Sequence, residues 1–275
     1  MYNSIKSYYI NINRFRKKTL FRIKSMNVKP NEKPIIIFGN QKSGTTAIAA
    51  LLGMYIEKDV TLDILPIWEI IDKIILKKSQ FPNFVNTYSV LFSKHIIKEP
   101  WLTFIPSQVY SRFPKSKYIL IVRDPRDNIR SILDKLNIPG NKEKNPYGIR
   151  ELKTGWKQVF MPELYHWKCN HYIEILSKRW NYAVSIPSNF RLQNIFIVRY
   201  EDFKMDKVNF IKNLANELGE KGKIDIKQLI NYSFQPKGRN RDIPWQEFFG
   251  EKNLHRIENI CENNMKKYNY KKSIS

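Results

Sequence analysis

The sequence predicts a single α/β domain built on a mostly parallel central sheet of about five strands flanked by helices. Short runs of β-branched and other apolar residues recur along the chain and alternate with longer helical patterns, as in parallel sheets covered by helices. The first of these runs is followed by a small polar loop and a helix start. At 275 residues, the chain is long enough to bury a full core as one domain.

The composition is strongly basic. The chain has 48 Lys and Arg against 25 Asp and Glu, a net charge of +23, which favours polyanionic partners: a nucleotide cofactor, an acidic glycan, an anionic membrane surface or nucleic acid. Its two cysteines, Cys169 and Cys261, form no CxxC pair, and no histidine pair has ligand spacing. We therefore expect neither a disulfide framework nor a metal site, and a reducing, cytoplasmic location.

Residues 1–33 form a basic N-terminal extension. They contain nine Lys and Arg and a single acid, Glu32, interleaved with apolar and aromatic side chains. No apolar run here is long enough for a signal peptide or a spanning helix. Two interpretations remain open: a basic amphipathic segment that lies peripherally on an anionic membrane or partner, and an extension packed on the protein surface.

The first strand predicted in the domain, Ile35–Phe38, leads through a tight loop into a helix from Thr45 to about Tyr55. Loop amides and the positive end of the helix dipole then point at one place, so this strand-loop-helix unit is an anion cradle. In a P-loop NTPase the lysine follows the second glycine. Here Thr45 occupies that position and Lys42 lies two residues before Gly44, which argues against a nucleotide triphosphatase.

The string QKSGTT resembles the 5′-phosphosulfate loop of sulfotransferases that use 3′-phosphoadenosine 5′-phosphosulfate (PAPS). The resemblance implies that Lys42 neutralises charge on the bridging oxygen as the bond breaks. Ala47 replaces the tryptophan that stacks on adenine in the cytosolic branch, which leaves that contact unassigned. The implied cofactor-binding residues of this loop are Gln41, Lys42, Ser43, Gly44, Thr45 and Thr46.

A short strand over Ile56–Val60 and helices over Pro66–Lys78 and Pro82–Phe92 come next, and the helices are expected to form the acceptor side of the cleft. The following strand, from His95, is stopped by Pro100. Sulfotransferases have a lysine at this strand end, and the cytosolic branch has a histidine base after it. Because Pro100 stands where that histidine would be, the base must come from elsewhere.

Two side chains are alternatives for the base, Glu99 and His95, while Lys98 is expected to steady the sulfuryl oxygens. Glu99 and His95 would point to the same face of the strand, but they are four residues apart, a separation of roughly 13 Å. Only one can touch the reacting oxygen. Glu99 is preferred because it lies at the carboxyl end of the strand, where the cleft is expected.

A helix is predicted over Trp101–Phe113, followed by a strand over Lys117–Val122. Arg123 stands at the end of this strand, and the RDPRD turn leads into a helix that carries Ser131. This arrangement resembles the 3′-phosphate site of sulfotransferases. A delocalised cation and a hydroxyl donor suit a single phosphate.

Residues 137–165 break the regular pattern and form a loop-rich, aromatic and basic stretch. Such loops usually carry specificity, so we expect an acceptor lid, with a solvent-exposed insertion as the alternative. An amphipathic helix is predicted over Leu164–Val184. Its members expected in the core are Trp167, Tyr172, Ile175, Leu176 and Trp180.

The last predicted strand, Ile195–Arg199, ends in RYEDF, and the resemblance implies that Tyr200 borders the adenine. Glu201 and Asp202 precede a helix predicted over Lys204–Leu218. The segment 235–245 resembles a late KG…W loop that closes over the 3′-phosphate, and a final helix is predicted over Glu251–Lys267. The cofactor-binding residues implied for the late loop are Lys237, Gly238 and Arg239.

Taken over residues 34–270, the resemblance implies a sulfotransferase domain. It would move a sulfuryl group from PAPS to a hydroxyl or amine of an acceptor, without a metal. The cationic surplus and the basic, aromatic stretch favour a carbohydrate or glycolipid acceptor. Two other classes stay open: a nucleotide-dependent kinase of the P-loop class and a non-catalytic basic module that binds nucleic acid, although nucleic acid is not the expected partner.

Overall fold

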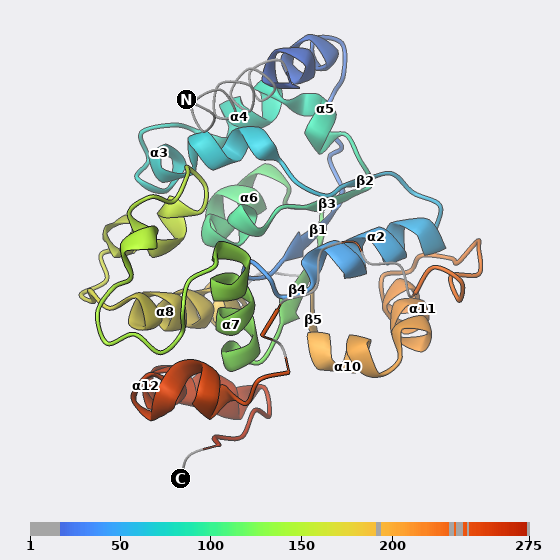
Figure 1. The fold of residues 1–275 in the computed structure, drawn as a ribbon. Coiled ribbons are helices and arrows are strands. Elements are labelled where there is room, and N and C mark those ends of the chain that lie inside the picture. Colours follow the sequence, from blue (N-terminus) through green and yellow to red (C-terminus); the bar gives the residue numbers. More distant parts are fainter. Residues whose placement is uncertain (1–16, 191–193, 231–233, 235–238, 241, 274–275) are drawn as a thin grey trace, which may run out of the picture.

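The computed structural model describes residues 17–190, 194–230, 234, 239–240 and 242–273. A five-stranded sheet crosses the molecule in the order β2-β3-β1-β4-β5, and all four strand pairs are parallel (Figure 1). This confirms the predicted single α/β domain with about five strands. The strands are β1 (Ile35–Phe38), β2 (Val60–Thr61), β3 (Ile96–Lys98), β4 (Lys117–Val122) and β5 (Ile195–Arg199).

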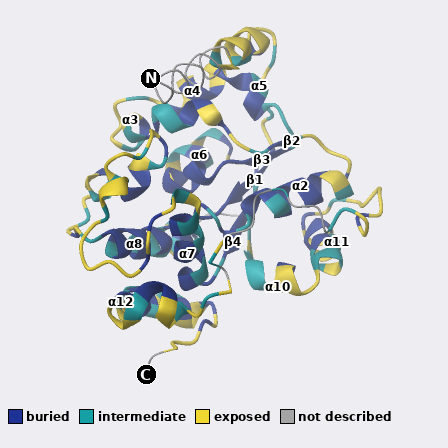
Figure 2. Cartoon of the chain, viewed as in Figure 1, coloured by how far each residue is buried: buried dark blue, intermediate teal, exposed yellow. Residues whose placement is uncertain are grey.

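The central strand β1 divides the core into two parts, because successive side chains of a strand point to opposite faces. Ile36 and Phe38 belong to one buried cluster, and Ile35 and Ile37 belong to the other. In Figure 2 the central strands β1, β3 and β4 are coloured mostly as buried, whereas the edge strand β5 is partly exposed. The second cluster is covered by α2 (Thr45–Tyr55), α10 (Tyr200–Met205) and α11 (Lys207–Glu217), and the first by α6 (Pro106–Arg112), α7 (Pro125–Leu136), α8 (Tyr172–Val184) and α12 (Trp245–Lys267).

Helices predicted as continuous are broken where the backbone leaves the helical region. The predicted helix over Trp101–Phe113 is split at Ile105 (φ −135°, ψ 44°), because Pro106 follows and disfavours a helical conformation at the residue before it. The helical segments between β2 and β3 are similarly divided, at Ile70 and Tyr88. The pieces are η1 (Leu65–Glu69), α3 (Ile71–Ile75), α4 (Phe81–Thr87), α5 (Ser89–Phe92) and η2 (Pro100–Phe104).

The predicted helix from Leu164 begins only at Tyr172, because His166 is left-handed (φ 56°) and ends a short 3₁₀ turn. Its expected core residues from Tyr172 onward are buried, whereas Trp167 is half-buried. Helix α12 starts at Trp245, and the predicted start at Glu251 coincides with a kink at Gly250 (φ 68°). The remaining short helices are η3 (Tyr147–Ile149), η4 (Lys157–Phe160), η5 (Pro162–Tyr165) and α9 (Ile186–Phe190).

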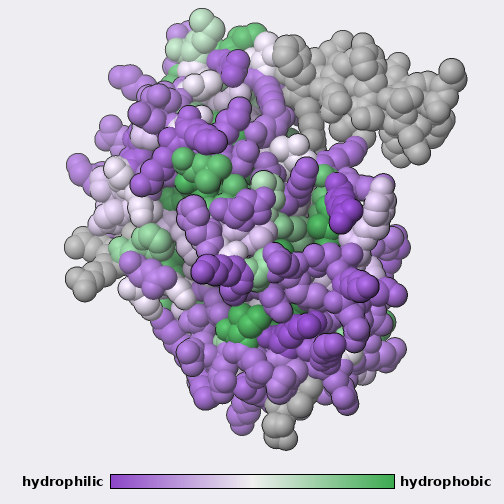
Figure 3. Space-filling view, turned by 90° about the vertical axis from the view of Figure 1, so that its left-hand side faces the viewer, coloured by the Kyte–Doolittle hydropathy of each residue, from purple (hydrophilic) through white to green (hydrophobic). Residues whose placement is uncertain are grey.

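The described part of the N-terminal extension begins with a helix over residues 17–25, which we call the N-terminal helix. It packs on the domain through Ser25, whose carbonyl accepts from the Ser89 hydroxyl at 3.0 Å and whose Oγ accepts from the Val90 amide at 3.2 Å. Across the residues that the structure describes, no helix has the length and hydropathy needed to cross a bilayer. One face of the molecule is dominated by hydrophilic side chains, with small, separate hydrophobic patches (Figure 3).

Candidate active site

The loop between β1 and α2 is a cradle of buried polar residues. Gly39, the first residue of the loop, makes two hydrogen bonds with the Thr103 hydroxyl of η2. This hydroxyl donates to the Gly39 carbonyl at 3.1 Å and accepts from the Gly39 amide at 2.9 Å. Gly44 is left-handed (φ 88°), and a Cβ there would lie 2.2 Å from Cδ2 of Tyr200. Glycine is therefore required by conformation and by space. This brings the predicted adenine neighbour, Tyr200, directly against the loop.

Asn128, in the first turn of α7, fixes the middle of the loop. Its Nδ2 donates to the Gln41 carbonyl at 2.9 Å and to the Ser43 hydroxyl at 3.1 Å, and its Oδ1 accepts from Asn40 at 2.8 Å. Asn128 is fully buried. Buried polar networks whose members are satisfied hold one conformation, so this amide presets the loop for an anion.

A second support comes from Arg179 of α8, which is fully buried. Its Nη2 donates to Gln41 Oε1 at 2.9 Å, and its guanidinium carbon lies 3.4 Å from the centre of the Phe104 ring. Burial lowers the pKa of Arg179, and the aromatic face and the amide oxygen offset part of that cost. The residue before Lys42 is thus anchored from the interior of the protein.

Arg123, at the end of β4, reaches back to the same loop. Its Nη1 donates to the Lys42 carbonyl at 2.8 Å, and its guanidinium stacks over Tyr200 with 4.8 Å to the ring centre. The Asp124 amide donates to Glu201 Oε1 at 2.9 Å. The RDPRD turn and the RYEDF strand end therefore meet beside the cradle, as expected for neighbouring parallel strands.

Lys42 lies within a group of cations. Burial is the largest cause that lowers the pKa of Lys42 to about 8, followed by the charges of Lys135, Arg123 and Lys98. Repulsion among these charges is relieved when an anion binds between them. Lys135 was missed by sequence reasoning. It lies four residues after Ser131 on α7, so the helical period places both on one side, a signal that could have found it.

Lys98, the last residue of β3, has a nearly buried side chain that donates to Asp63 Oδ1 at 2.8 Å. The Asp63 side chain is 43% exposed. Asp63 follows the short strand β2, whose carboxyl end lies beside that of β3. Asp63 is thus a solvent-accessible carboxylate held by Lys98, the predicted sulfuryl-binding lysine. The sequence did not predict a role for Asp63, because the residues after β2 have no periodic pattern.

Glu99 lies at the carboxyl end of β3, as predicted, but it is fully buried. Its Oε2 accepts from the Ile64 amide at 2.8 Å and from Trp68 Nε1 at 3.1 Å, and its Oε1 accepts from the Trp101 amide at 3.1 Å. Burial is the main cause that raises the pKa of Glu99 to about 7. This geometry holds neighbouring chain segments in place and leaves the carboxylate little access to an acceptor.

His95, the alternative base, precedes β3 at the amino end of the strand. Its Nε2 is 2.8 Å from Oε1 of Glu220. The cradle lies beyond the opposite ends of the strands, so the structure does not bring His95 together with Lys42. Among the described residues, no group of three or more His, Cys, Asp or Glu side chains has an arrangement that could hold a metal ion.

Comparisons with known proteins agree with this geometry. The family model of the sulfotransferase domain matches residues 32–243. The chain belongs to the sulfotransferase family. No curated protein sequence matches it significantly. Members of this family use PAPS as the sulfuryl donor.

Solved sulfotransferases share the fold of the chain. A mouse sulfotransferase complexed with PAP is 14% identical, with 90% of this chain and 89% of that chain covered and a TM-score of 0.50. A sulfotransferase from Mycobacterium avium is 10% identical, with 88% and 78% covered and a TM-score of 0.53. At such identities the likeness concerns the fold alone.

The late loop of this sulfotransferase is docked along α7. Asn240 Nδ2 donates to Asp134 at 2.5 Å, the Ile243 carbonyl accepts from Arg130 at 2.5 Å, and Trp245 Nε1 donates to Asp127 Oδ1 at 2.9 Å. Lys237 and Gly238 lie outside the described residues, and Arg239 is exposed. The described residues of the late loop therefore lie against α7, the helix that carries the half-buried Ser131.

The basic, aromatic stretch 137–165 packs against Trp68 of η1. A Cβ at Gly155 (φ 96°) would lie 2.4 Å from the Trp68 ring, and Gln158 Nε2 donates to the Trp68 carbonyl at 3.3 Å. Trp156 meets Trp68 edge to face at 6.3 Å. Because Trp68 also donates to Glu99, this stretch is packed beside the residues at the end of β3.

Proposed function

We propose that this sulfotransferase transfers a sulfuryl group from PAPS to a hydroxyl or amine of a glycan or glycolipid. The observation that carries the proposal is the gathering of Lys42, Lys98, Arg123 and Lys135 around one preset anion loop. A P-loop kinase would need a lysine after Gly44. A nucleic-acid module would explain the net charge but not the buried supports of the loop.

In the proposed donor complex, amides of residues 42–46 with Thr45 and Thr46 hold the 5′-phosphosulfate. Arg123 and Ser131 hold the 3′-phosphate with Lys237, Gly238 and Arg239 of the late loop, and Tyr200 borders the adenine. The Arg123 guanidinium is supported in this role by its contacts with the Lys42 carbonyl and the Tyr200 ring. The stacking partner that Ala47 cannot supply stays unassigned.

In the proposed reaction, the acceptor oxygen or nitrogen attacks sulfur, and the bond from sulfur to the bridging phosphate oxygen breaks. Lys42 neutralises the charge that develops on the leaving phosphate, and Lys98 steadies the sulfuryl oxygens. We place the acceptor proton on Asp63, because its carboxylate is partly exposed and already positioned by Lys98 at 2.8 Å. Transfer of this kind depends on positioning and electrostatic stabilisation.

Transfer of radiolabelled sulfate from PAPS tests the proposed activity. Acidic and neutral polysaccharides, lipid-linked sugars, and small phenols and amines would be offered separately. Label incorporated into a saccharide-bearing acceptor is the expected result. Labelling of phenols alone would contradict the proposed acceptor class, and magnesium-dependent turnover of ATP without sulfate transfer would contradict the proposed reaction.

The affinity for adenosine 3′,5′-bisphosphate (PAP), the product of the donor, is expected to fall as the pH rises through about 8, the pKa of Lys42. Bound phosphate favours protonated Lys42 and raises its pKa, so the enzyme takes up protons when PAP binds near this pH. Calorimetry in buffers with different ionisation enthalpies measures this uptake. Affinity that is flat from pH 7 to 9.5 would show that Lys42 does not face the phosphate.

Deletion of residues 140–149 is expected to impair acceptor turnover and to leave PAP binding intact. Seven of these ten residues are exposed, and the segment belongs to the proposed lid, whose later part packs on Trp68. The measurements are kcat/KM for an acceptor found in the transfer screen and PAP affinity by calorimetry. Unchanged turnover of every acceptor would show that the segment is no lid.

We also propose that the N-terminal helix contacts an anionic membrane surface. Leu20, Ile23 and Met26 are 48, 60 and 80% exposed, and basic residues including Lys17 and Lys24 flank them. Apolar side chains next to cations favour anionic bilayers. The free, buried thiols of Cys169 and Cys261 are compatible with the cytoplasmic side of such a membrane.

Co-sedimentation with vesicles tests the membrane contact. Binding to phosphatidylglycerol-rich vesicles is expected to exceed binding to pure phosphatidylcholine, and Leu20→Ser/Ile23→Ser is expected to weaken it several-fold through lost apolar burial. Met54→Ser, a substitution of a partly exposed residue on α2, is the control. Equal vesicle binding by the native enzyme, Leu20→Ser/Ile23→Ser and Met54→Ser would contradict a contact through this helix.

A further inference from the structure

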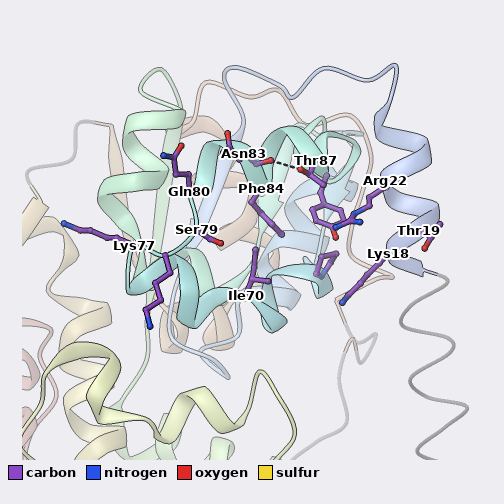
Figure 4. A pocket seen from close by; sticks show the side chains of 13 residues that line it. Lys18, Thr19, Arg22, Ile70, Lys77, Ser79, Gln80, Asn83, Phe84 and Thr87 are labelled. Carbon is purple, nitrogen blue, oxygen red and sulfur yellow. Dashed lines mark hydrogen bonds between the residues drawn. The ribbon is translucent and has the colours of Figure 1, made fainter.

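A cavity of about 690 Å³ lies between the N-terminal helix and the segment that runs from η1 through α3 to the end of α4. In Figure 4, Lys18 and Arg22 reach into it from the N-terminal helix, and Lys77 lies on the opposite side. Arg22 is stacked over the ring of Tyr88, with 5.6 Å to its centre. A volume of this size is typical of pockets for small molecules or for one unit of a larger ligand.

The lining combines positive charge with neutral polar groups. Of its 13 described residues, four are Lys or Arg, five carry a side-chain hydroxyl or amide outside the aromatic residues, and none is Asp or Glu. Lys18 is ion-paired with Glu69 beside the cavity. The net charge of the lining is therefore supplied by Arg22, Lys77 and Lys78, all of which are exposed.

A second, small cavity lies beside the first, along η1. This cavity, of about 20 Å³, shares Lys18 and Pro66 with the first one and is also lined by Leu65, Trp68 and Glu69. Trp68 donates to Glu99 at 3.1 Å, and Leu65 lies two residues after Asp63. Pro66 and Ile70 of the cavity wall follow Asp63 by three and seven residues, so an acceptor of several units is needed to span from the cavity to Asp63.

One wall of the cavity does not belong to the shared domain. The sulfotransferase family match begins at residue 32, whereas Lys18, Thr19 and Arg22 precede it. The cavity is also lined by none of the loop residues 39–46 or by Arg123. It is thus separate from the donor site and is formed in part by the chain's own N-terminal helix.

We propose that this cavity binds an acidic sugar unit of the acceptor, other than the unit that receives the sulfuryl group. The inference rests on the proposed transfer to a glycan or glycolipid. Arg22 on one side and Lys77 and Lys78 on the other give the cavity a positive potential that attracts the carboxylate or sulfate of that unit, and Ser79, Gln80 and Asn83 offer hydrogen bonds to its hydroxyl groups. A polyhydroxylated acid satisfies both kinds of group, since charge alone would leave the neutral donors and acceptors unused.

Binding of a fluorescein-labelled oligogalacturonate, a sugar chain with one carboxylate per unit, tests this inference by anisotropy. The variant Arg22→Gln/Lys77→Gln/Lys78→Gln is expected to bind it about tenfold or more weakly than the native enzyme, because the cavity loses three positive charges. The matched control Lys58→Gln/Lys115→Gln/Lys221→Gln removes the same charge from exposed positions elsewhere. It is expected to bind nearly as well as the native enzyme.

Equal weakening of both triple variants would overturn the inference, because attraction would then follow net charge alone. Unchanged oligogalacturonate binding by the cavity variant would also overturn it. If that variant lost only its binding to phosphatidylglycerol vesicles, the cavity would be a lipid headgroup site and the inference would be wrong. PAP affinity of the native enzyme is measured in parallel. Absence of PAP binding would contradict the proposed donor. It would not affect the test of the cavity, which depends only on oligogalacturonate binding by the two triple variants.

Discussion

Lys42→Met is expected to lower kcat by about 10²–10³, the usual cost of removing one group that stabilises charge in a transition state. Methionine keeps much of the length of the side chain and removes its charge. The loss arises because the leaving phosphate of PAPS gains negative charge as the sulfur–oxygen bond breaks, and Lys42 is the cation carried by the loop itself. The loop conformation should survive, because its supports are Asn128, Thr103 and Arg179.

Single-turnover transfer of labelled sulfate measures this effect apart from product release. Lys115→Met, a change at an exposed lysine before β4, is the matched control and should leave kcat near the native value. A Lys42→Met enzyme with native kcat and only weakened PAPS binding would show that Lys42 contributes uniform binding rather than transition-state stabilisation.

Asp63→Asn is expected to reduce kcat by about 10²–10⁴, the range typical for removal of a positioned base. Asparagine keeps the shape and can still accept a hydrogen bond from Lys98, but it cannot take the acceptor proton. PAP affinity should change little, since Asp63 lies on the acceptor side of Lys98. The measurement is kcat with saturating donor and acceptor, together with calorimetric PAP affinity.

Glu99→Gln and His95→Asn are the comparisons that assign the base. Gln at position 99 places an amide NH₂ among three N–H donors, so lower thermal stability is expected, with a smaller loss of kcat than in Asp63→Asn. His95→Asn should cost little, because His95 faces Glu220. If Glu99→Gln or His95→Asn abolishes turnover while Asp63→Asn is mild, Asp63 is not the base and the sequence-based assignment of Glu99 or His95 is restored.

The native enzyme should also report the burial of Glu99 through its stability. The pKa of Glu99 is raised from 4.5 to about 7, so the folded protein holds this proton more tightly than the unfolded chain. The Glu99 contribution to the free energy of unfolding is full below about pH 4.5 and is lost as pH rises through about 7. Glu99→Gln should remove this component from the pH dependence of urea unfolding.

The features that sequence predicted best depend on neighbours close in the chain. The four apolar residues Ile35–Phe38, the glycines of the loop and the helix start at Thr45 are encoded within a dozen residues. The RDPRD turn after β4 is equally local, because Asp124 caps α7 by accepting from the Arg126 amide at 2.9 Å. These elements position the donor site.

The acceptor side could not be read in this way, because its contacts join distant residues. Asp63 meets Lys98 35 positions away, and Arg179 reaches Gln41 across 138 positions. Local pattern gave Glu99 a position at the right strand end but not the three N–H groups that surround its carboxylate. The cavity beside the N-terminal helix likewise depends on how the extension packs against α4.

Calorimetric binding of PAP and of ATP, each measured once with EDTA and once with magnesium, tests whether the loop and its cations form a PAPS site. PAP carries both phosphates that the proposed site expects, one for the loop and one for Arg123 and Ser131. The enzyme should bind PAP at least tenfold more tightly than ATP, without magnesium. Equal affinity for the two nucleotides, or ATP binding that requires magnesium and exceeds PAP binding, would show that the loop is not a PAPS site.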